Sequence, residues 1–169
     1  NWDRTMKAYE LLTQGIGFKE TDPITAVNHA YEREDLADYY IKPIVIMNKG
    51  KPIAKLRDDD SIIFWNFRSD RARQITYALN KPAFDDFPRK VWPHVHFVCM
   101  SGYDSHLSLP VAFPQKTVEN NLTHVLARYG LKQLRIAETE KSAHVTFFFN
   151  SQIEEPVKGE DRIFVPSPK

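Results

Sequence analysis

Residues 61–71, SIIFWNFRSDR, join an apolar run to a cluster of charged residues. The run 61–67 is rich in β-branched and aromatic side chains and is apolar almost throughout, so it predicts a strand that is buried on both faces. Such a strand is typical of the centre of an α/β sheet. Apolar residues at helical spacing then predict a helix over 72–80.

Helical and strand-like patterns alternate on both sides of this segment. Before it, we expect helices over 1–14 and from Asp22-Pro23 onward, and a hairpin over 43–56. After it, the patterns predict a buried strand over 94–100, a helix over 117–129, and strands over 132–137, 145–149 and 161–165. Because strands alternate with helices, the sequence predicts an α/β fold.

An irregular segment that contains two prolines interrupts these patterns between 102 and 115. Domain boundaries commonly fall in segments of this kind, so we expect one here. The predicted division is a first domain over 1–112, a linker over 113–116 and a second domain over 117–169.

The charge balance argues against two classes of partner. The 169 residues include 23 basic and 22 acidic residues, which leaves a formal net charge of +1. Nucleic-acid binders and polybasic membrane-surface proteins carry a larger positive charge, so we expect neither nucleic acid nor a membrane as a partner. No apolar run approaches the roughly 18–20 residues that a membrane-spanning helix needs. Cys99 is the one cysteine and is expected in the core.

The charged cluster after the apolar run is the first candidate site. In open α/β sheets, ligands bind beyond the carboxyl ends of the strands, and a helix N-terminus there favours anions. Arg68 and Arg71 add two guanidinium groups that match carboxylate or phosphate oxygens, and Asp70 can hold one of them in place beside Ser69. Arg73 is expected in solvent. The alternative is a surface helix start with ordinary ion pairs.

A second candidate lies in the segment 138–144, ETEKSAH, after the strand expected over 132–137. In a loop at the end of a strand, the ammonium group of Lys141 could neutralise a phosphoryl group. The alternative is an ordinary exposed lysine beside two glutamates. His144 is an acid–base candidate, although a single histidine before an apolar run is more often structural.

His94 and His96 are separated by one residue, so on a strand they would share a face and could form part of a metal site. A third ligand is not visible nearby in the sequence. The chain also lacks a glycine-rich phosphate loop, a zinc-type cysteine pattern and a nucleophile elbow. We therefore expect no metal ion to be bound by this chain's own residues.

Several long motifs resemble the cofactor-independent phosphoglycerate mutase family. They occur in order along the whole chain: NWDR at 1–4, IFWNFRSDRARQ at 63–74, VAFP at 111–114, LKQLRIAETEK at 131–141, HVTFFFN at 144–150 and GEDR at 159–162. The resemblance implies a larger, two-domain enzyme. This chain would be an internal piece of that enzyme and inactive by itself.

The resemblance also implies what the two predicted domains are. Residues 1–112 would be the C-terminal half of an inserted α/β substrate-binding domain. Residues 117–169 would be part of an alkaline-phosphatase-like phosphotransfer domain. The family's nucleophilic serine and its ligands for two divalent metal ions, usually Mn²⁺, have no counterparts in this sequence.

The family reaction interconverts 3-phosphoglycerate and 2-phosphoglycerate through a phosphoserine, without bisphosphoglycerate. By resemblance, Arg68, Ser69, Asp70 and Arg71 are substrate-binding residues, and Lys141 is both substrate-binding and catalytic because it faces the phosphoryl group. The resemblance further implies a cytoplasmic monomer whose partners are the two phosphoglycerates and the remaining segments of the same polypeptide. A non-catalytic module that binds phosphate or carboxylate is the alternative function.

Overall fold

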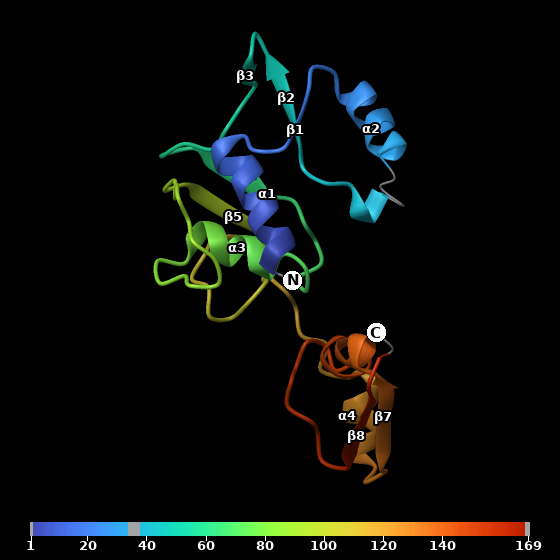
Figure 1. Ribbon diagram of the computed structural model, residues 1–169. Coiled ribbons are helices and arrows are strands. Elements are labelled where there is room, and N and C mark those ends of the chain that lie inside the picture. Colours follow the sequence, from blue (N-terminus) through green and yellow to red (C-terminus); the bar gives the residue numbers. More distant parts are fainter. Residues whose placement is uncertain (1, 34–37, 168–169) are drawn as a thin grey trace. The chain divides into compact units, whose positions relative to one another are not determined.

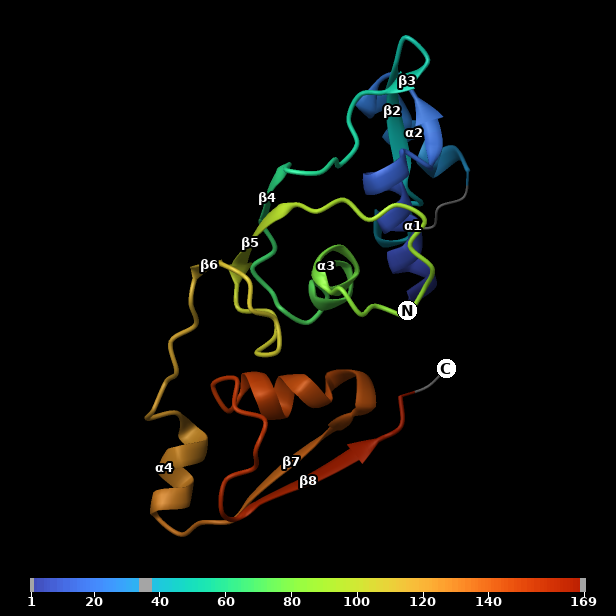
Figure 2. The same ribbon diagram turned by 90° about the vertical axis from the view of Figure 1, so that its left-hand side faces the viewer.

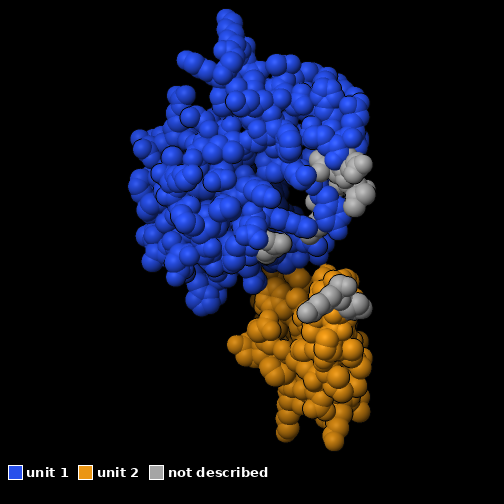
Figure 3. Space-filling model, in the orientation of Figure 1, with its two compact units in different colours: residues 1–114 blue, residues 115–169 orange. Residues whose placement is uncertain are grey.

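The structure, a computed structural model, describes residues 2–33 and 38–167 (Figure 1). The chain divides into two compact units, Asn1–Pro114 and Gln115–Lys169 (Figure 3). This division falls within 113–116, where we expect the linker, whereas the assignment of the units to two kinds of domain stays a prediction. Asn1 of the helix predicted over 1–14, and residues 168–169 of the second predicted domain, lie outside the described residues.

Unit 1 begins with a small mixed sheet and the helices beside it. Its elements are α1 (Trp2–Gln14), β1 (Phe18–Glu20), α2 (Pro23–Glu32), the 3-10 helix η1 (Asp38–Tyr40), β2 (Ile44–Asn48) and β3 (Lys51–Pro52). Strand β1 pairs in parallel with β2, which pairs antiparallel with β3. The predicted hairpin is confirmed, and Gly50 takes a positive φ of 77° in its turn.

A second sheet of unit 1 carries the charged cluster. Its strands are β4 (Ser61–Phe64), β5 (His96–Ser101) and β6 (Val111–Phe113), in the order β4-β5-β6, and all pairings are parallel (Figure 2). Helix α3 (Arg73–Asn80) connects β4 to the segment before β5. Parallel strands with a connecting helix confirm the predicted α/β class.

Strand β4 is not the central strand that its apolar sequence predicts. Among the described strands it pairs with β5 alone, and the central position belongs to β5. Its two faces differ: Ile62 and Phe64 are partly buried, whereas Ile63 is 67% exposed. The prediction is wrong because a continuous apolar run shows only that both faces of the strand are apolar. It does not show that other residues of this chain cover both faces.

The core of unit 1 lies where α1 and α3 pack against the second sheet. Buried side chains from α1, α3, β5 and the intervening loops meet there: Tyr9, Ala72, Ala78, Leu79, Phe87, Phe97, Cys99 and Tyr103. Tyr9 and Phe87 contact edge to face, with ring centroids 5.5 Å apart. Cys99 is buried as expected, and burial raises the pKa of its thiol. This core supports α3 and therefore the loop that enters it.

Unit 2 contains one parallel strand pair and three helical segments. Its elements are α4 (Leu122–Arg128), β7 (Gln133–Glu138), the 3-10 helix η2 (Thr139–Lys141), the π-helix η3 (His144–Phe148) and β8 (Glu160–Val165). Strands β7 and β8 pair in parallel from Gln133 with Glu160 to Glu138 with Val165. Helix α4 begins later than the predicted residue 117, because the side chain of Asn121 caps it by accepting from the His124 N–H.

The strand predicted over 145–149 is a π-helix. Its run of Val, Thr and Phe has a high strand propensity, which is what misled the prediction. Hydrogen bonds along the segment favour helix instead: the Thr146 hydroxyl donates to the Ser142 carbonyl at 2.9 Å, and the Asn150 N–H donates to the Thr146 carbonyl at 2.8 Å. Asn150, just after the segment, also bonds to Thr123 and Glu160 from other elements, and such tertiary contacts can override local propensity.

Candidate functional site

The charged cluster forms a loop, Arg68–Arg71, that we call the arginine loop. It follows β4 and precedes α3, so it lies at the carboxyl end of a parallel strand (Figure 2). The loop after β5 leaves the same edge of the sheet, because β4 and β5 run in the same direction. This edge is where α/β sheets bind ligands.

Ser101, the last residue of β5, and Tyr103, just after it, hold the backbone that leads into the arginine loop. The buried Tyr103 hydroxyl donates to the carbonyls of Phe64, at 2.8 Å, and Asn66, at 2.5 Å. The Ser101 hydroxyl donates to the Phe67 carbonyl at 2.6 Å. The loop is therefore fixed by buried hydrogen bonds although its own side chains are exposed. Sequence reasoning missed Ser101 and Tyr103, because no local pattern reveals a contact across two strands.

Within the arginine loop, the side chains differ in exposure. Arg68 and Arg71 are exposed, and the Arg68 Nε lies 3.7 Å from an Asp70 carboxylate oxygen. Ser69 is buried, and within the described part of the chain its hydroxyl has no hydrogen-bond partner. Ala72, the N-cap residue of α3, supplies no side-chain cap. The loop thus combines two guanidinium groups with an uncapped helix N-terminus, which suits an anionic ligand.

We expect Arg73 in solvent from the sequence, and this prediction is wrong. Arg73 is partly buried, and its Nε donates to the Tyr103 carbonyl at 2.7 Å. Arg73 therefore joins α3 to the loop after β5. The prediction failed because helical spacing alone does not reveal a partner thirty residues away.

A cluster around Asp104 ties the same two elements together. Its carboxylate accepts from the Tyr77 hydroxyl at 2.5 Å and from the backbone N–H of His106 at 2.9 Å. The His106 ring nitrogen Nδ1 lies 2.8 Å from the carboxylate. Burial by itself raises the pKa of Asp104, but these hydrogen bonds and the charge of Arg73 outweigh it and hold the pKa at about 2. Burial and the bond to Asp104 raise the pKa of Tyr77 to about 12.

The depressed pKa of Asp104 predicts a pH-dependent contribution to stability. A carboxyl group with a lowered folded pKa stabilises the fold above its unfolded pKa, and this contribution is lost as the pH falls toward the folded value of about 2. Asp104→Asn should therefore destabilise the protein at pH 7 by about 2 kcal/mol, at 1.36 kcal/mol per pKa unit. The difference from wild type should shrink steadily below pH 4.

Thermal unfolding midpoints of wild type and variant, compared between pH 7 and pH 2.5, check this prediction. Asp59→Asn is the control, because the Asp59 side chain is 92% exposed whereas that of Asp104 is 14% exposed. A destabilisation by Asp104→Asn that stayed constant with pH would contradict the proposed origin in the carboxylate.

Lys141 ends the 3-10 helix η2, which directly follows β7. Its ammonium group forms a close ion pair with Glu140 and lies 3.6 Å from a carboxylate oxygen of Glu138. The hydrogen bond to Glu140 is the main cause that raises the pKa of Lys141 above its usual value, with a further contribution from Glu138. The side chain is about half exposed. It is therefore a protonated, accessible cation at neutral pH.

Ser167, which follows β8, forms hydrogen bonds with the short helix that contains Lys141. The Ser167 hydroxyl accepts from the Glu140 N–H at 3.0 Å and lies 3.1 Å from the Thr139 hydroxyl. The Ser167 N–H donates to the same Thr139 hydroxyl at 3.1 Å. The position of Lys141 thus depends on both strands of the parallel pair.

The histidines do not form a metal centre in this structure. His94 precedes β5 and its ring lies 4.6 Å from that of Trp92, while His96 is exposed and 3.9 Å from Asp59. His144 begins the π-helix, and its ring lies 5.7 Å from that of Phe148. Across residues 2–33 and 38–167, no group of three or more His, Cys, Asp or Glu side chains is placed to hold a metal ion. No helix in the same residues has the length and apolarity to cross a membrane.

A family model and several curated relatives that match this chain all belong to one family. The family model described as "BPG-independent PGAM N-terminus" matches residues 1–105. Over 99% of this chain, a 2,3-bisphosphoglycerate-independent phosphoglycerate mutase of Methanococcoides burtonii is 51% identical, and one of Methanosarcina barkeri is 54% identical. The corresponding protein of Moorella thermoacetica is 50% identical. The chain spans about a third of the length of these curated relatives, 33% in each case.

A solved structure shares the fold. The Leishmania mexicana phosphoglycerate mutase, crystallised at low cobalt concentration, matches with a TM-score of 0.82 and 26% sequence identity. The match covers 100% of this chain and 32% of that one.

Proposed function

Because the chain belongs to the family of 2,3-bisphosphoglycerate-independent phosphoglycerate mutases, we propose that the whole protein interconverts 3-phosphoglycerate and 2-phosphoglycerate. The single observation that carries this proposal is the arginine loop, a pair of exposed guanidinium groups at the carboxyl edge of a parallel sheet. This chain contributes cationic groups of the reaction, and other segments of the polypeptide contribute the nucleophile.

We assign the carboxylate end of the substrate to the arginine loop. A phosphoglycerate carries three negative charges, and a guanidinium group can bind a carboxylate through two parallel hydrogen bonds. Arg68 and Arg71 are exposed, whereas the backbone beneath them is held by buried contacts. Asp70 orients Arg68, and Ser69 supplies a hydroxyl at the base of the loop. The loop therefore binds without rearranging, which lowers the entropic cost of binding.

We assign the transferring phosphoryl group to Lys141. Charge builds on the phosphoryl oxygens during transfer, and a fixed cation stabilises it. Since Glu140 and Glu138 raise the pKa of Lys141, the side chain keeps its proton at neutral pH. It therefore acts as a positive charge and a hydrogen-bond donor, and not as a general base.

The serine nucleophile and the metal ions belong to other segments in this proposal. The donors that this chain offers do not fit a divalent metal, since the described residues contain no suitable cluster. Two divalent ions, with Mn²⁺ as the first candidate, would be held elsewhere in the whole protein.

Exposed apolar side chains indicate that the first partner of this chain is the rest of the same polypeptide. Large apolar side chains are exposed on the sheet of β4 and on the sheet of β7, including Ile63, Trp65 and Phe67 on or just after β4, and Leu134 and Ile136 on β7. A parallel sheet is normally covered on both faces, so we propose that other segments cover these side chains. The proposal further describes a cytoplasmic monomer, in which neither nucleic acid nor a membrane is a partner.

Turnover by the whole protein tests the function. We expect the full-length protein, supplied with Mn²⁺, to convert 3-phosphoglycerate to 2-phosphoglycerate without added 2,3-bisphosphoglycerate, and the 169-residue chain to show no turnover. Enolase-coupled absorbance measures the product. Binding of phosphoglycerate by a full-length protein that shows no turnover would favour the non-catalytic module instead.

A further inference from the structure

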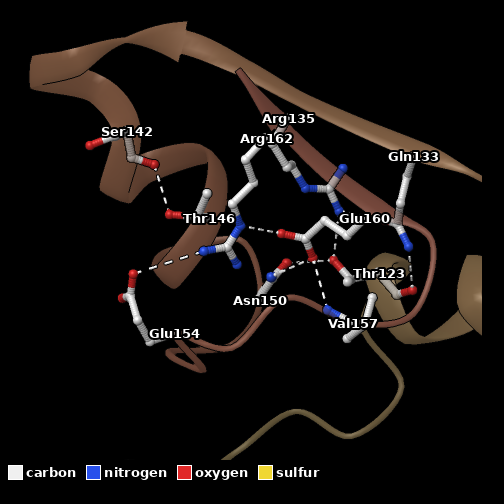
Figure 4. A network of polar contacts seen from close by, with 10 residues as sticks. All are labelled: Thr123, Gln133, Arg135, Ser142, Thr146, Asn150, Glu154, Val157, Glu160 and Arg162. Atoms are coloured by element: carbon white, nitrogen blue, oxygen red, sulfur yellow. Dashed lines mark hydrogen bonds and ion pairs between the residues drawn. The ribbon is translucent and has the colours of Figure 1, made fainter. Parts of the chain in front are cut away.

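A buried polar network joins α4, β7 and β8 of unit 2, and Asn150 lies at its centre (Figure 4). The Asn150 side chain is fully buried: its carbonyl accepts from the Thr123 hydroxyl of α4 at 2.7 Å, and its amide donates to Glu160 of β8 at 2.9 Å. Gln133 and Arg135 of β7 extend the network to Thr123, with hydrogen bonds of 3.0 Å to its carbonyl and 2.8 Å to its hydroxyl. Both strands and the helix thus depend on one amide.

Glu160 is the carboxylate at the centre of this network. Its side chain is completely buried, and the Arg162 Nε donates to it at 2.7 Å. Burial by itself raises the pKa of Glu160, but hydrogen bonds from Arg162, Asn150 and the Val157 N–H outweigh burial and lower the pKa. The carboxylate is therefore ionised and hydrogen-bonded. Because it is buried, a shift of any of its hydrogen-bond partners would leave it incompletely paired, at a large cost in free energy.

The network reaches Lys141 through the π-helix. Asn150 follows the last turn of η3, and its N–H donates to the carbonyl of Thr146. The Thr146 hydroxyl donates in turn to the carbonyl of Ser142, the residue directly after Lys141, at 2.9 Å. The Ser142 hydroxyl closes the path by donating to the Thr139 carbonyl at 2.8 Å, within the 3-10 helix that carries Lys141.

We infer that Asn150 and Glu160 are positioning residues: through the π-helix they set where the Lys141 ammonium group lies relative to the phosphoryl group. The inference rests on the proposed function. A π-helix is rare and occurs often at functional sites. The Asn150–Glu160 hydrogen bond anchors its C-terminal end to a strand, and loss of that anchor frees the segment that begins at Lys141.

The inference is tested in the full-length protein by exchanging the amide and the carboxylate across the Asn150–Glu160 hydrogen bond. Asn150→Asp keeps the side-chain shape but removes the amide donor and places a second carboxylate against Glu160. We expect kcat to fall about tenfold or more, with KM for 3-phosphoglycerate changed less than about twofold, because misplacing a reacting group weakens the transition state more than the ground state. Combining Asn150→Asp with Glu160→Gln restores one amide and one carboxylate, and should recover most of the lost kcat.

A readout that needs no turnover separates this inference from the proposed function. The rate at which an acylating reagent modifies Lys141, followed by peptide mass spectrometry between pH 7 and pH 10, reports the surroundings of its ammonium group. We expect Asn150→Asp to change this rate at least about threefold by loosening the contact with Glu140, and the double variant to return it toward wild type. A wild type without mutase activity would sink the proposed function and leave this measurement valid.

Two further variants keep the test decisive. Thr146→Val removes the hydroxyl that reaches Ser142 without burying a new charge, and should change Lys141 acylation in the same direction if Asn150→Asp fails to fold. Glu154→Gln is the control, because Glu154 is mostly exposed and lies 3.9 Å from Arg162 at the rim of the network (Figure 4). Folded Asn150→Asp or Thr146→Val proteins with wild-type kcat and wild-type Lys141 acylation would overturn the inference.

Discussion

Arg68→Ala in the full-length protein should lower kcat/KM for 3-phosphoglycerate by about 100- to 1,000-fold. Truncating one partner of a hydrogen-bonded charge pair costs about 2–5 kcal/mol, and each 1.4 kcal/mol is a factor of ten. Since Arg68 would hold the substrate's carboxylate in both the ground state and the transition state, much of the loss should be in KM. Steady-state kinetics in both directions of the reaction measure this split.

Arg68→Lys separates charge from geometry. Lysine keeps the positive charge but cannot form two parallel hydrogen bonds, so its loss should lie between wild type and Arg68→Ala. Arg57→Ala is the matched control: it removes an exposed arginine of the same unit that precedes β4 instead of following it. Equal effects of Arg57→Ala and Arg68→Ala would show that general charge, and not the arginine loop, attracts the substrate.

Lys141→Met should give the second large effect, a fall in kcat of about 100- to 1,000-fold with a smaller change in KM. Removing one preorganised donor to a developing anion costs about this much in enzymes that depend on it. Because the pKa of Lys141 is raised above its ordinary value, the wild-type kcat should show no loss attributable to this residue between pH 7 and pH 9. Single-turnover kinetics distinguish the chemical step from product release.

Lys158→Met is the control for this second prediction. Lys158 is an exposed lysine of the same unit, in the loop before β8, and its loss should leave kcat within about twofold, as is usual for surface substitutions. If Lys141→Met raised KM and left kcat unchanged, Lys141 would be a binding residue for the ground state alone. If neither constant changed, Lys141 would be an ordinary exposed lysine.

The three candidate cations were all visible in the sequence, because each stands in a recognisable local context. Arg68 and Arg71 follow an apolar strand and precede a helix, and Lys141 follows a second strand. A strand end and a helix start are defined by a few consecutive residues, so the positions of such residues on the chain can be predicted locally. Their roles stay predictions until the variants above are measured.

The residues that hold these cations in place were not visible. Tyr103 bonds to a carbonyl 39 positions away, and Asp104 bonds to a tyrosine 27 positions away. Asn150 bonds to Thr123 across 27 positions. In the sequence, each of these residues stands among ordinary loop or strand neighbours. Only packing of distant segments makes them into supports for the arginine loop and for Lys141.

Two errors of prediction have the same origin. The apolar run 61–67 predicts a buried central strand, yet β4 has one exposed face within the described chain, where Trp65 just beyond the strand is 75% exposed. The aromatic run 145–149 predicts a strand, yet a π-helix forms, and Asn150 just after it is held by Thr123 and Glu160 from distant elements. Both runs were assigned from composition, which reports what a segment can bury and not what lies against it.

The α/β class, the helix starts at Asp22-Pro23 and near residue 72, and the chain positions of the three cations can thus be read from the amino-acid sequence. They depend on backbone preferences and on apolar spacing, which act over a few residues. The exposed face of β4, the π-helix and the buried bonds of Tyr103 and Asn150 appear only in the folded chain. A buried polar group must find its partner wherever folding brings one, and that partner is set by the packing of whole elements and not by sequence neighbours.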